Sequence, residues 1–261
     1  MVNGTIYLYG GRATYQTSQT SNTWSERISV LLIVTAGLII HSDNDFLTMD
    51  MTKTWQISSP SVNGLIQPSG VPPVANGYLW SSYNSLYLYG GEYSDNPVTL
   101  PAPFALWEYN IGSSSWQEHN SPLTSSGLNA PDHGVAVQNA AEGAGFSVAA
   151  LGRGWYFGGH QDAFTTAGWS VQAPRIYLKS MAEFTFPGYK NNDVQSLSNG
   201  QTAGSDGVWR NVTGGGSQDQ AGFPERADGV LVYVPSFGKE GILLGLAGGT
   251  SDTFVSFPKY N

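Results

Sequence analysis

The sequence predicts an all-β fold built from repeated four-stranded units, and two observations carry this prediction. A short apolar or aromatic run that ends in a glycine pair occurs four times: IYLYGG at 6–11, LYLYGG at 86–91, WYFGG at 155–159 and LLGLAGG at 243–249. The 261 residues also include 33 glycines and 14 prolines, which indicates many tight turns between short strands. Self-similar segments of this kind are typical of a repeat architecture.

Each unit contains four predicted strands. The first follows an Asn-Gly, His-Gly or Asp-Gly pair with a proline ahead of it, and its expected positions are 75–80, 132–137 and 227–232. The second ends in the glycine pair, because a buried strand followed by two glycines implies a bend that a side chain would obstruct. The third runs up to an Asp or Asn turn, and the fourth begins at a tryptophan, namely Trp55, Trp116 or Trp209.

Four-stranded antiparallel units in series are the blades of a β-propeller. The order of strand, glycine pair, aromatic-containing loop, Asp or Asn turn and tryptophan resembles the kelch repeat over most of the chain. The most similar type is the fungal kelch propeller, often anchored to a membrane or wall, which implies a secreted or membrane-anchored surface protein. Propellers of the galactose oxidase-like architecture include copper radical oxidases, whose cofactor needs a cysteine cross-linked to a tyrosine. This chain has no cysteine, so we expect no such cofactor.

The predicted blade units span residues 1–59, 74–120, 132–213 and 227–261 of a single domain. The first unit lacks its opening strand, and the last has two strands with neither the Asp turn nor the tryptophan. A closed propeller has about four to eight full blades. We therefore expect an incomplete arc of about three to four four-stranded blades, with the remaining blades in a longer chain.

The first unit is interrupted by a long apolar run, ISVLLIVTAGLII at 28–40. Removal of the eighteen residues 26–43 restores the spacing of the second unit, which predicts an insertion. Thirteen residues span about 20 Å as a helix, less than the ~30 Å hydrocarbon core, so a membrane crossing is disfavoured. The favoured explanation is an accidental insertion such as a translated intron, and a buried strand or helix that caps the propeller is the alternative.

Composition excludes several classes of function. The net charge is −8 with 11% charged residues and no basic run, which argues against a nucleic-acid groove or an anionic membrane surface. The absence of cysteine excludes disulfides and thiolate metal sites. We expect no signal peptide in this chain, because Met1 leads within a few residues into a predicted strand. Its composition favours an extracellular protein, with a cytoplasmic location as the alternative, and Asn3 and Asn211 fit the glycosylation acceptor pattern.

No catalytic set and no metal site are predicted, because the four histidines make no pair at metal-ligand spacing. The position after the glycine pair holds Arg12, Glu92, His160 or Thr250, and a position that varies in charge is typical of a loop residue facing a binding surface. Trp169, in the loop after the third glycine pair, is the best candidate for an exposed aromatic side chain.

These observations favour a non-catalytic propeller that binds a protein or a glycan through its inter-strand loops, with no cofactor. The alternative is a hydrolase or lyase acting on glycans or small metabolites in the central channel. Convergent carboxylates or a metal in the channel would favour the enzyme, whereas small and apolar side chains would favour the scaffold.

Overall fold

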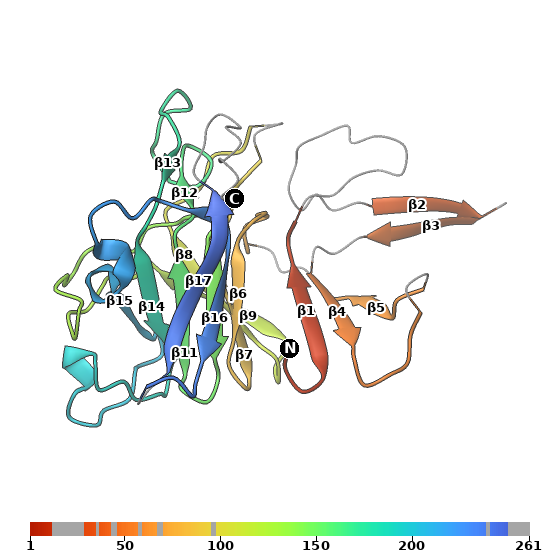
Figure 1. The fold of residues 1–261 in the computed structure, drawn as a ribbon. Coiled ribbons are helices and arrows are strands. Elements are labelled where there is room, and N and C mark those ends of the chain that lie inside the picture. Colours follow the sequence, from red (N-terminus) through yellow and green to blue (C-terminus); the bar gives the residue numbers. More distant parts are fainter. Residues whose placement is uncertain are drawn as a thin grey trace, which may run out of the picture.

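The computed structural model describes residues 1–11, 29–34, 37–42, 46–56, 59–66, 70–94, 98–238 and 241–249. These residues form strands and three short 3₁₀ helices (Figure 1). The strands are β1 (Thr5–Tyr9), β2 (Ser29–Val34), β3 (Gly37–Ser42), β4 (Phe46–Asp50), β5 (Val62–Gly64), β6 (Tyr78–Ser81), β7 (Ser85–Tyr89), β8 (Ala105–Asn110), β9 (Ser115–Asn120), β10 (Ala144–Val148), β11 (Arg153–Phe157), β12 (His160–Gln161), β13 (Ile176–Tyr177), β14 (Met181–Thr185), β15 (Val208–Asn211), β16 (Ala227–Val234) and β17 (Ile242–Gly249). The helices are η1 (Gln195–Leu197), η2 (Thr213–Gly215) and η3 (Ser217–Asp219).

The main strands form four antiparallel sheets that follow one another along the chain. Two sheets have four strands, in the orders β6-β7-β8-β9 and β10-β11-β14-β15. The sheet before them has the order β1-β4-β5, and the sheet after them contains β16 and β17. The predicted all-β fold of four-stranded antiparallel units is confirmed, and the number of blades stays a prediction.

The glycine pairs join consecutive sheets, which explains why they repeat. The second glycine donates its N–H to a carbonyl just before the first strand of the next sheet: Gly11 to Val74 at 3.1 Å, Gly91 to Ala140 at 2.9 Å and Gly159 to Arg226 at 2.6 Å. At Gly90 the backbone has a φ of +75°, and a Cβ would lie 2.2 Å from the Ala140 carbonyl oxygen. Any side chain there would separate two sheets.

The core lies between the faces of neighbouring sheets and is largely aromatic. Between the second and third sheets, Trp80 and Tyr89 pack against Phe184 and Trp209. Between the first and second sheets, Phe46 packs edge-on against Tyr109 and beside Trp116. Further contacts between the third and fourth sheets involve Trp155 and Leu231. Large rings at each of these three interfaces therefore hold the described sheets together.

The first strand of the third sheet does not lie where the sequence pattern predicts it. It is β10, Ala144–Val148, and not 132–137. Glu142 corresponds to Asn76 and Asp228, because all three residues have a positive φ. The value is 59° at Glu142 and 57° at both Asn76 and Asp228. The prediction used His133, which is exposed, because His-Gly resembles the Asn-Gly and Asp-Gly pairs, whereas Glu is rarely found at positive φ.

The first sheet also differs in detail from its predicted pattern. Its last strand, β5, lies at Val62–Gly64, past the predicted end of the unit at residue 59. Trp55 therefore does not open that strand and lies in the segment that precedes it. Trp55 has the spacing of the repeat because a turn follows Asp50. In this turn the Asp50 carboxylate accepts hydrogen bonds from the N–H and the hydroxyl of Thr52.

The apolar run of the first unit lies outside the sheets of the series. Within the described residues, β2 and β3 pair with each other, while β1 pairs directly with β4 from Thr5↔Asp50 to Tyr9↔Phe46. That 26–43 is an insertion stays a prediction. Arg12 and Thr250 lie outside the described residues. Among the residues that are described, no helix has the length and apolar character needed to cross a bilayer.

Candidate functional site

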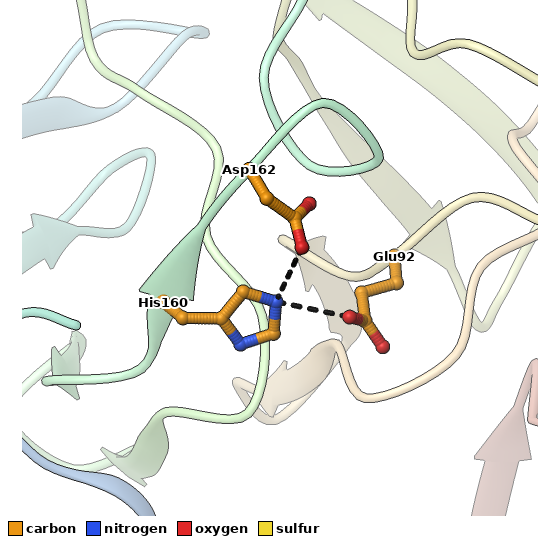
Figure 2. Close-up of side chains that lie close together, drawn as sticks. All are labelled: Glu92, His160 and Asp162. Atoms are coloured by element: carbon orange, nitrogen blue, oxygen red, sulfur yellow. Dashed lines mark ion pairs between the residues drawn. The ribbon is translucent and has the colours of Figure 1, made fainter. Parts of the chain in front are cut away.

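A cluster of charged side chains lies at the end of the sheets where the glycine pairs are found. His160, on β12, directly follows the third glycine pair and is fully buried. Glu92 follows the second glycine pair and is 6% exposed. Because the glycine pair of one sheet bonds to the start of the next sheet, these two repeat-equivalent positions meet, and His160 Nε2 lies 2.9 Å from Glu92 Oε1 (Figure 2).

Three carboxylates surround the imidazole. Besides Glu92, His160 Nδ1 lies 3.0 Å from Glu142 Oε2, and Nε2 lies 3.5 Å from Asp162 Oδ2. The ring nitrogens are not aligned well enough with these oxygens for hydrogen bonds, so the contacts are ion pairs. Burial alone lowers the pKa of His160, but the carboxylates of Glu142 and Glu92 outweigh burial and raise it to about 9. The histidine is therefore a buried cation at neutral pH.

Arg175 supplies the second positive charge. Its Nη2 donates to Glu92 Oε1 at 2.8 Å, and its Nε donates to Asp162 Oδ2 at 3.0 Å. Its side chain is 34% exposed, so it covers the cluster from the solvent side. Burial raises the pKa of Glu92, but His160 and Arg175 lower it below its ordinary value. Three carboxylates and two cations leave the cluster with a single excess negative charge.

Three members of the cluster also have a geometry that could hold a metal ion. Glu92, His160 and Asp162 offer ligand atoms within 4.8 Å of one another, which is a possible coordination geometry. A metal ligand must be a deprotonated imidazole, and in the protein alone the raised pKa of His160 favours the protonated form. Arg175 also binds the two carboxylate oxygens that would face the metal. A cation would have to displace both the proton and the guanidinium group.

The cluster fastens two loops to each other. One loop follows β7 and begins at Glu92, and the other joins β12 to β13 and contains Arg175. Tyr93 N–H donates to the Phe164 carbonyl at 2.9 Å between these loops. Asn139 Nδ2 donates to the carbonyls of Gly91 at 3.0 Å and of Thr165 at 2.8 Å. The result is a rigid base of ion pairs and backbone bonds beneath both loops.

Beyond this base, the two loops expose apolar side chains. Val98 and Leu100 of the first loop are 60% and 56% exposed, and Val171 of the second is 53% exposed. Trp169, the predicted exposed aromatic, lies in the second loop and is partly exposed. Loops that are fixed at the base and apolar at the surface are suited to contact with another molecule.

The sequence pattern singled out two members of the cluster and missed the other three. Glu92 and His160 were recognised from their place after the glycine pair, although the structure buries them. Asp162 and Arg175 carried no repeat signal, since they come from loop segments of different length, and Glu142 was missed because the prediction placed His133 at its repeat position. The glycine after Glu142 was the one available signal, because it matches the glycines after Asn76 and Asp228.

The two predicted glycosylation positions have different surroundings. Asn3 is exposed in the turn before β1, with a φ of +48°. Asn211 lies at the end of β15, where its Nδ2 donates to Asp132 at 2.8 Å and its Oδ1 accepts from the Thr213 hydroxyl at 2.6 Å. Glycosylation of Asn211 would replace one of the two Nδ2 hydrogens of a nitrogen that lies 2.8 Å from the Asp132 carboxylate.

No protein-family model matches the chain. The chain is 57% identical over 256 residues, 98% of its length, to a kelch repeat-containing protein of Arthroderma benhamiae, and it spans 36% of that relative. This similarity agrees with the serial four-stranded sheets, the interlocked glycine pairs and the aromatic packing between sheets. The chain has a kelch-type β-propeller fold and is similar to a kelch repeat-containing protein.

Proposed function

We propose that the chain is the non-catalytic part of a propeller scaffold that binds another protein through the loops that follow its glycine pairs. The observation that carries this proposal is the buried pairing of His160 and Glu92, which with Arg175 holds two long loops together. A buried cation is stable only when it is compensated. The two cations are each paired with carboxylates inside the cluster, so the effect of these ion pairs is to hold the loops in position.

The loop surface favours a protein partner. Exposed Val98, Leu100 and Val171 offer apolar contact area, which is typical of the centre of a protein interface. A glycan partner would need exposed aromatic faces, and Trp169 is the candidate in these loops that a glycan would use. We further propose that the remaining blades belong to a longer chain and that this chain is secreted or anchored at a cell surface. The greater length of the relative supports the first of these points.

Partner binding can be tested with two matched variants. The loop variant replaces Val98, Leu100 and Val171 with Asp. The control variant replaces Tyr83 and Phe237 with Asp. These two side chains are similarly exposed and lie in the turns between the first and second strands of their sheets. Immobilised wild-type protein and both variants are incubated with fungal surface and culture proteins, and in parallel with a panel of glycans. We expect proteins that bind the wild type and the control variant but not the loop variant. Equal binding to all three, or retention of glycans alone, would contradict the proposal.

One observation favours an enzyme as the second candidate. Asp228 lies next to Glu142, whose backbone carbonyl accepts the Asp228 N–H at 2.7 Å. Burial, followed by the negative charge of Glu142, raises the pKa of Asp228, and carboxyl groups with a perturbed pKa are often found at functional sites. The enzyme hypothesis predicts turnover of a glycan or aryl glycoside that Asp228→Asn and Glu142→Gln abolish. If the wild-type protein shows no turnover that these changes remove, this second hypothesis fails.

A further inference from the structure

A cavity of about 230 Å³ adjoins the aromatic core between the second and third sheets. Its walls come from the end of β7, from the segment between β9 and β10, and from β11, β14 and β15. Val135 belongs to the lining and is 51% exposed, so the cavity meets the solvent there. Among the described residues, the exposed apolar side chains of the two partner-binding loops are not part of this lining. The cavity is therefore a separate feature from the loop surface.

The walls of the cavity are mainly aromatic and aliphatic. Tyr89, Tyr156 and Trp209 are the aromatic residues of the lining, and all three are buried. Ala140 and Ala182 are small apolar residues of the same walls. An apolar cavity of about 150 Å³ is large enough to take up benzene. The cavity therefore has room for a six-membered ring with a small substituent.

Trp209 gives this cavity a hydrogen-bond donor that lacks an acceptor. Its ring is 2% exposed, and within the described residues its Nε1–H has no hydrogen-bond partner. Trp80 and Trp155 differ, because their Nε1 atoms donate to the Trp155 carbonyl and to Glu183, each at 3.0 Å. A buried donor without an acceptor is unfavourable. A single water is a poor remedy, since a buried water makes about two to four hydrogen bonds. An occupant with an acceptor atom would remove this cost.

Other polar groups of the walls already have partners in the protein. Tyr89 Oη donates to a backbone carbonyl at 2.8 Å, and Tyr156 Oη accepts a backbone N–H at 2.7 Å. Gln161 Nε2 donates to a backbone carbonyl at 2.8 Å. A sugar would need partners for several hydroxyl groups. The walls instead favour a ligand with one acceptor on an apolar body.

The charges in the lining favour an uncharged ligand. Arg210 Nη2 pairs with Glu183 at 2.7 Å, and its Nη1 donates to the Leu128 carbonyl at 2.7 Å. The partly exposed Asp132 accepts a hydrogen bond from Asn211. An anion would face the Asp132 carboxylate beside a guanidinium group that is already paired. Burial of a charge without a partner is costly, so an uncharged molecule fits the cavity best.

We propose that this cavity binds an uncharged aromatic compound with a carbonyl oxygen. The oxygen accepts a hydrogen bond from Trp209 Nε1–H, and the ring of the ligand packs among the side chains of Tyr89, Tyr156 and Ala182. The proposal goes beyond the proposed function and does not depend on it, because the loop residues that would contact a protein partner lie outside the cavity.

Magnetic resonance of the indole N–H groups tests the proposal on the full ¹⁵N-labelled chain. The probe is acetophenone, and ethylbenzene is the matched compound that lacks the oxygen. Benzoate and benzylamine are charged compounds of similar size. Trp209→Phe and Trp116→Phe each remove one indole signal and so identify both. Trp116 is the matched control, because its Nε1 also has no hydrogen-bond partner within the described residues and its ring is not part of the cavity lining.

We expect acetophenone to shift the Trp209 indole signal and to leave the Trp116 signal in place. Ethylbenzene should bind at least about tenfold more weakly, because it cannot accept the hydrogen bond. Ala182→Leu, which enlarges a side chain of the wall, should also weaken the binding of acetophenone at least about tenfold.

Three results would overturn the proposal. The first is an unshifted Trp209 signal at millimolar acetophenone. The second is equal binding of acetophenone and ethylbenzene, which would show that the indole N–H takes no part. The third is tighter binding of benzoate or benzylamine, which would show that the site is built for a charge. The comparison of the probes uses the unmodified chain and does not depend on the folding of any variant.

Discussion

The stability of the chain should fall as the pH rises from about 6.5 to about 10, because of His160. Its pKa is 6.5 as a free side chain and about 9 in the fold, where Glu92, Glu142 and Asp162 face it and Arg175 lies beside them. The folded state therefore binds the proton more tightly than the unfolded state. The resulting stabilisation is complete below pH 6.5 and disappears as the pH passes through 9. At 1.36 kcal/mol per pKa unit, it amounts to about 3 kcal/mol.

Urea unfolding at a series of pH values measures this effect. The wild type should lose up to about 3 kcal/mol of unfolding free energy across the window, whereas His160→Gln should lose much less. The buried His119 also has a raised pKa, mainly through Glu108, so the difference between the two proteins is the quantity that isolates His160. His133→Gln, at an exposed position, is the matched control and should follow the wild-type profile. Parallel profiles for wild type and His160→Gln would show that the buried imidazole is neutral and that the ion-pair account is wrong.

Three further predictions concern packing, the insertion and glycosylation. Trp209→Ala should lower the unfolding free energy by about 3–5 kcal/mol because the Trp209 ring is 2% exposed. Trp116→Ala should lower it by about 1–3 kcal/mol because the Trp116 ring is half-buried. Urea unfolding measures both losses, and a larger loss at Trp116 than at Trp209 would contradict this order. Deletion of 26–43 should leave the unfolding free energy within about 1 kcal/mol and reduce aggregation in light scattering, and loss of cooperative unfolding would refute the insertion hypothesis. In a secretory host, mass spectrometry should find glycan at Asn3 more often than at Asn211, because Asn211 Nδ2 donates a hydrogen bond to Asp132. Higher glycan occupancy at Asn211 would show that the modification precedes folding of β15.

The strand order was predictable because its signal is local and steric. A glycine pair is required wherever one sheet touches the backbone of the next, so Gly90 and its equivalents repeat regardless of the loops around them. The first strand of the third sheet was not predictable from the same rule. Its turn residue is Glu142, which carries a backbone strain that Asn76 and Asp228 tolerate better. Glu142 is also the turn residue whose carboxylate lies 3.0 Å from His160 Nδ1.

The sequence predicted where two of the site residues lie in the repeat, but it did not predict their burial or their ion-pair partners. Spacing marked Glu92 and His160 as equivalent, and equivalence in a repeat places residues at the same end of neighbouring sheets. Their burial depends on Arg175, which reaches them from a loop whose length has no counterpart in the second unit. Contacts of this kind are set by three-dimensional packing between segments far apart in the chain, and a local pattern carries no information about them.

The pairing of β1 with β4 has a consequence for engineering and evolution. Tyr9 and Phe46 are register partners although 36 residues lie between them. The entropy of closing a flexible loop grows only as the logarithm of its length, so a doubling costs about 0.6 kcal/mol. This connection is therefore a permissive site at which foreign sequence can be accepted while the sheet keeps its register. It is the position at which a reporter domain or a new recognition module could be inserted into this scaffold.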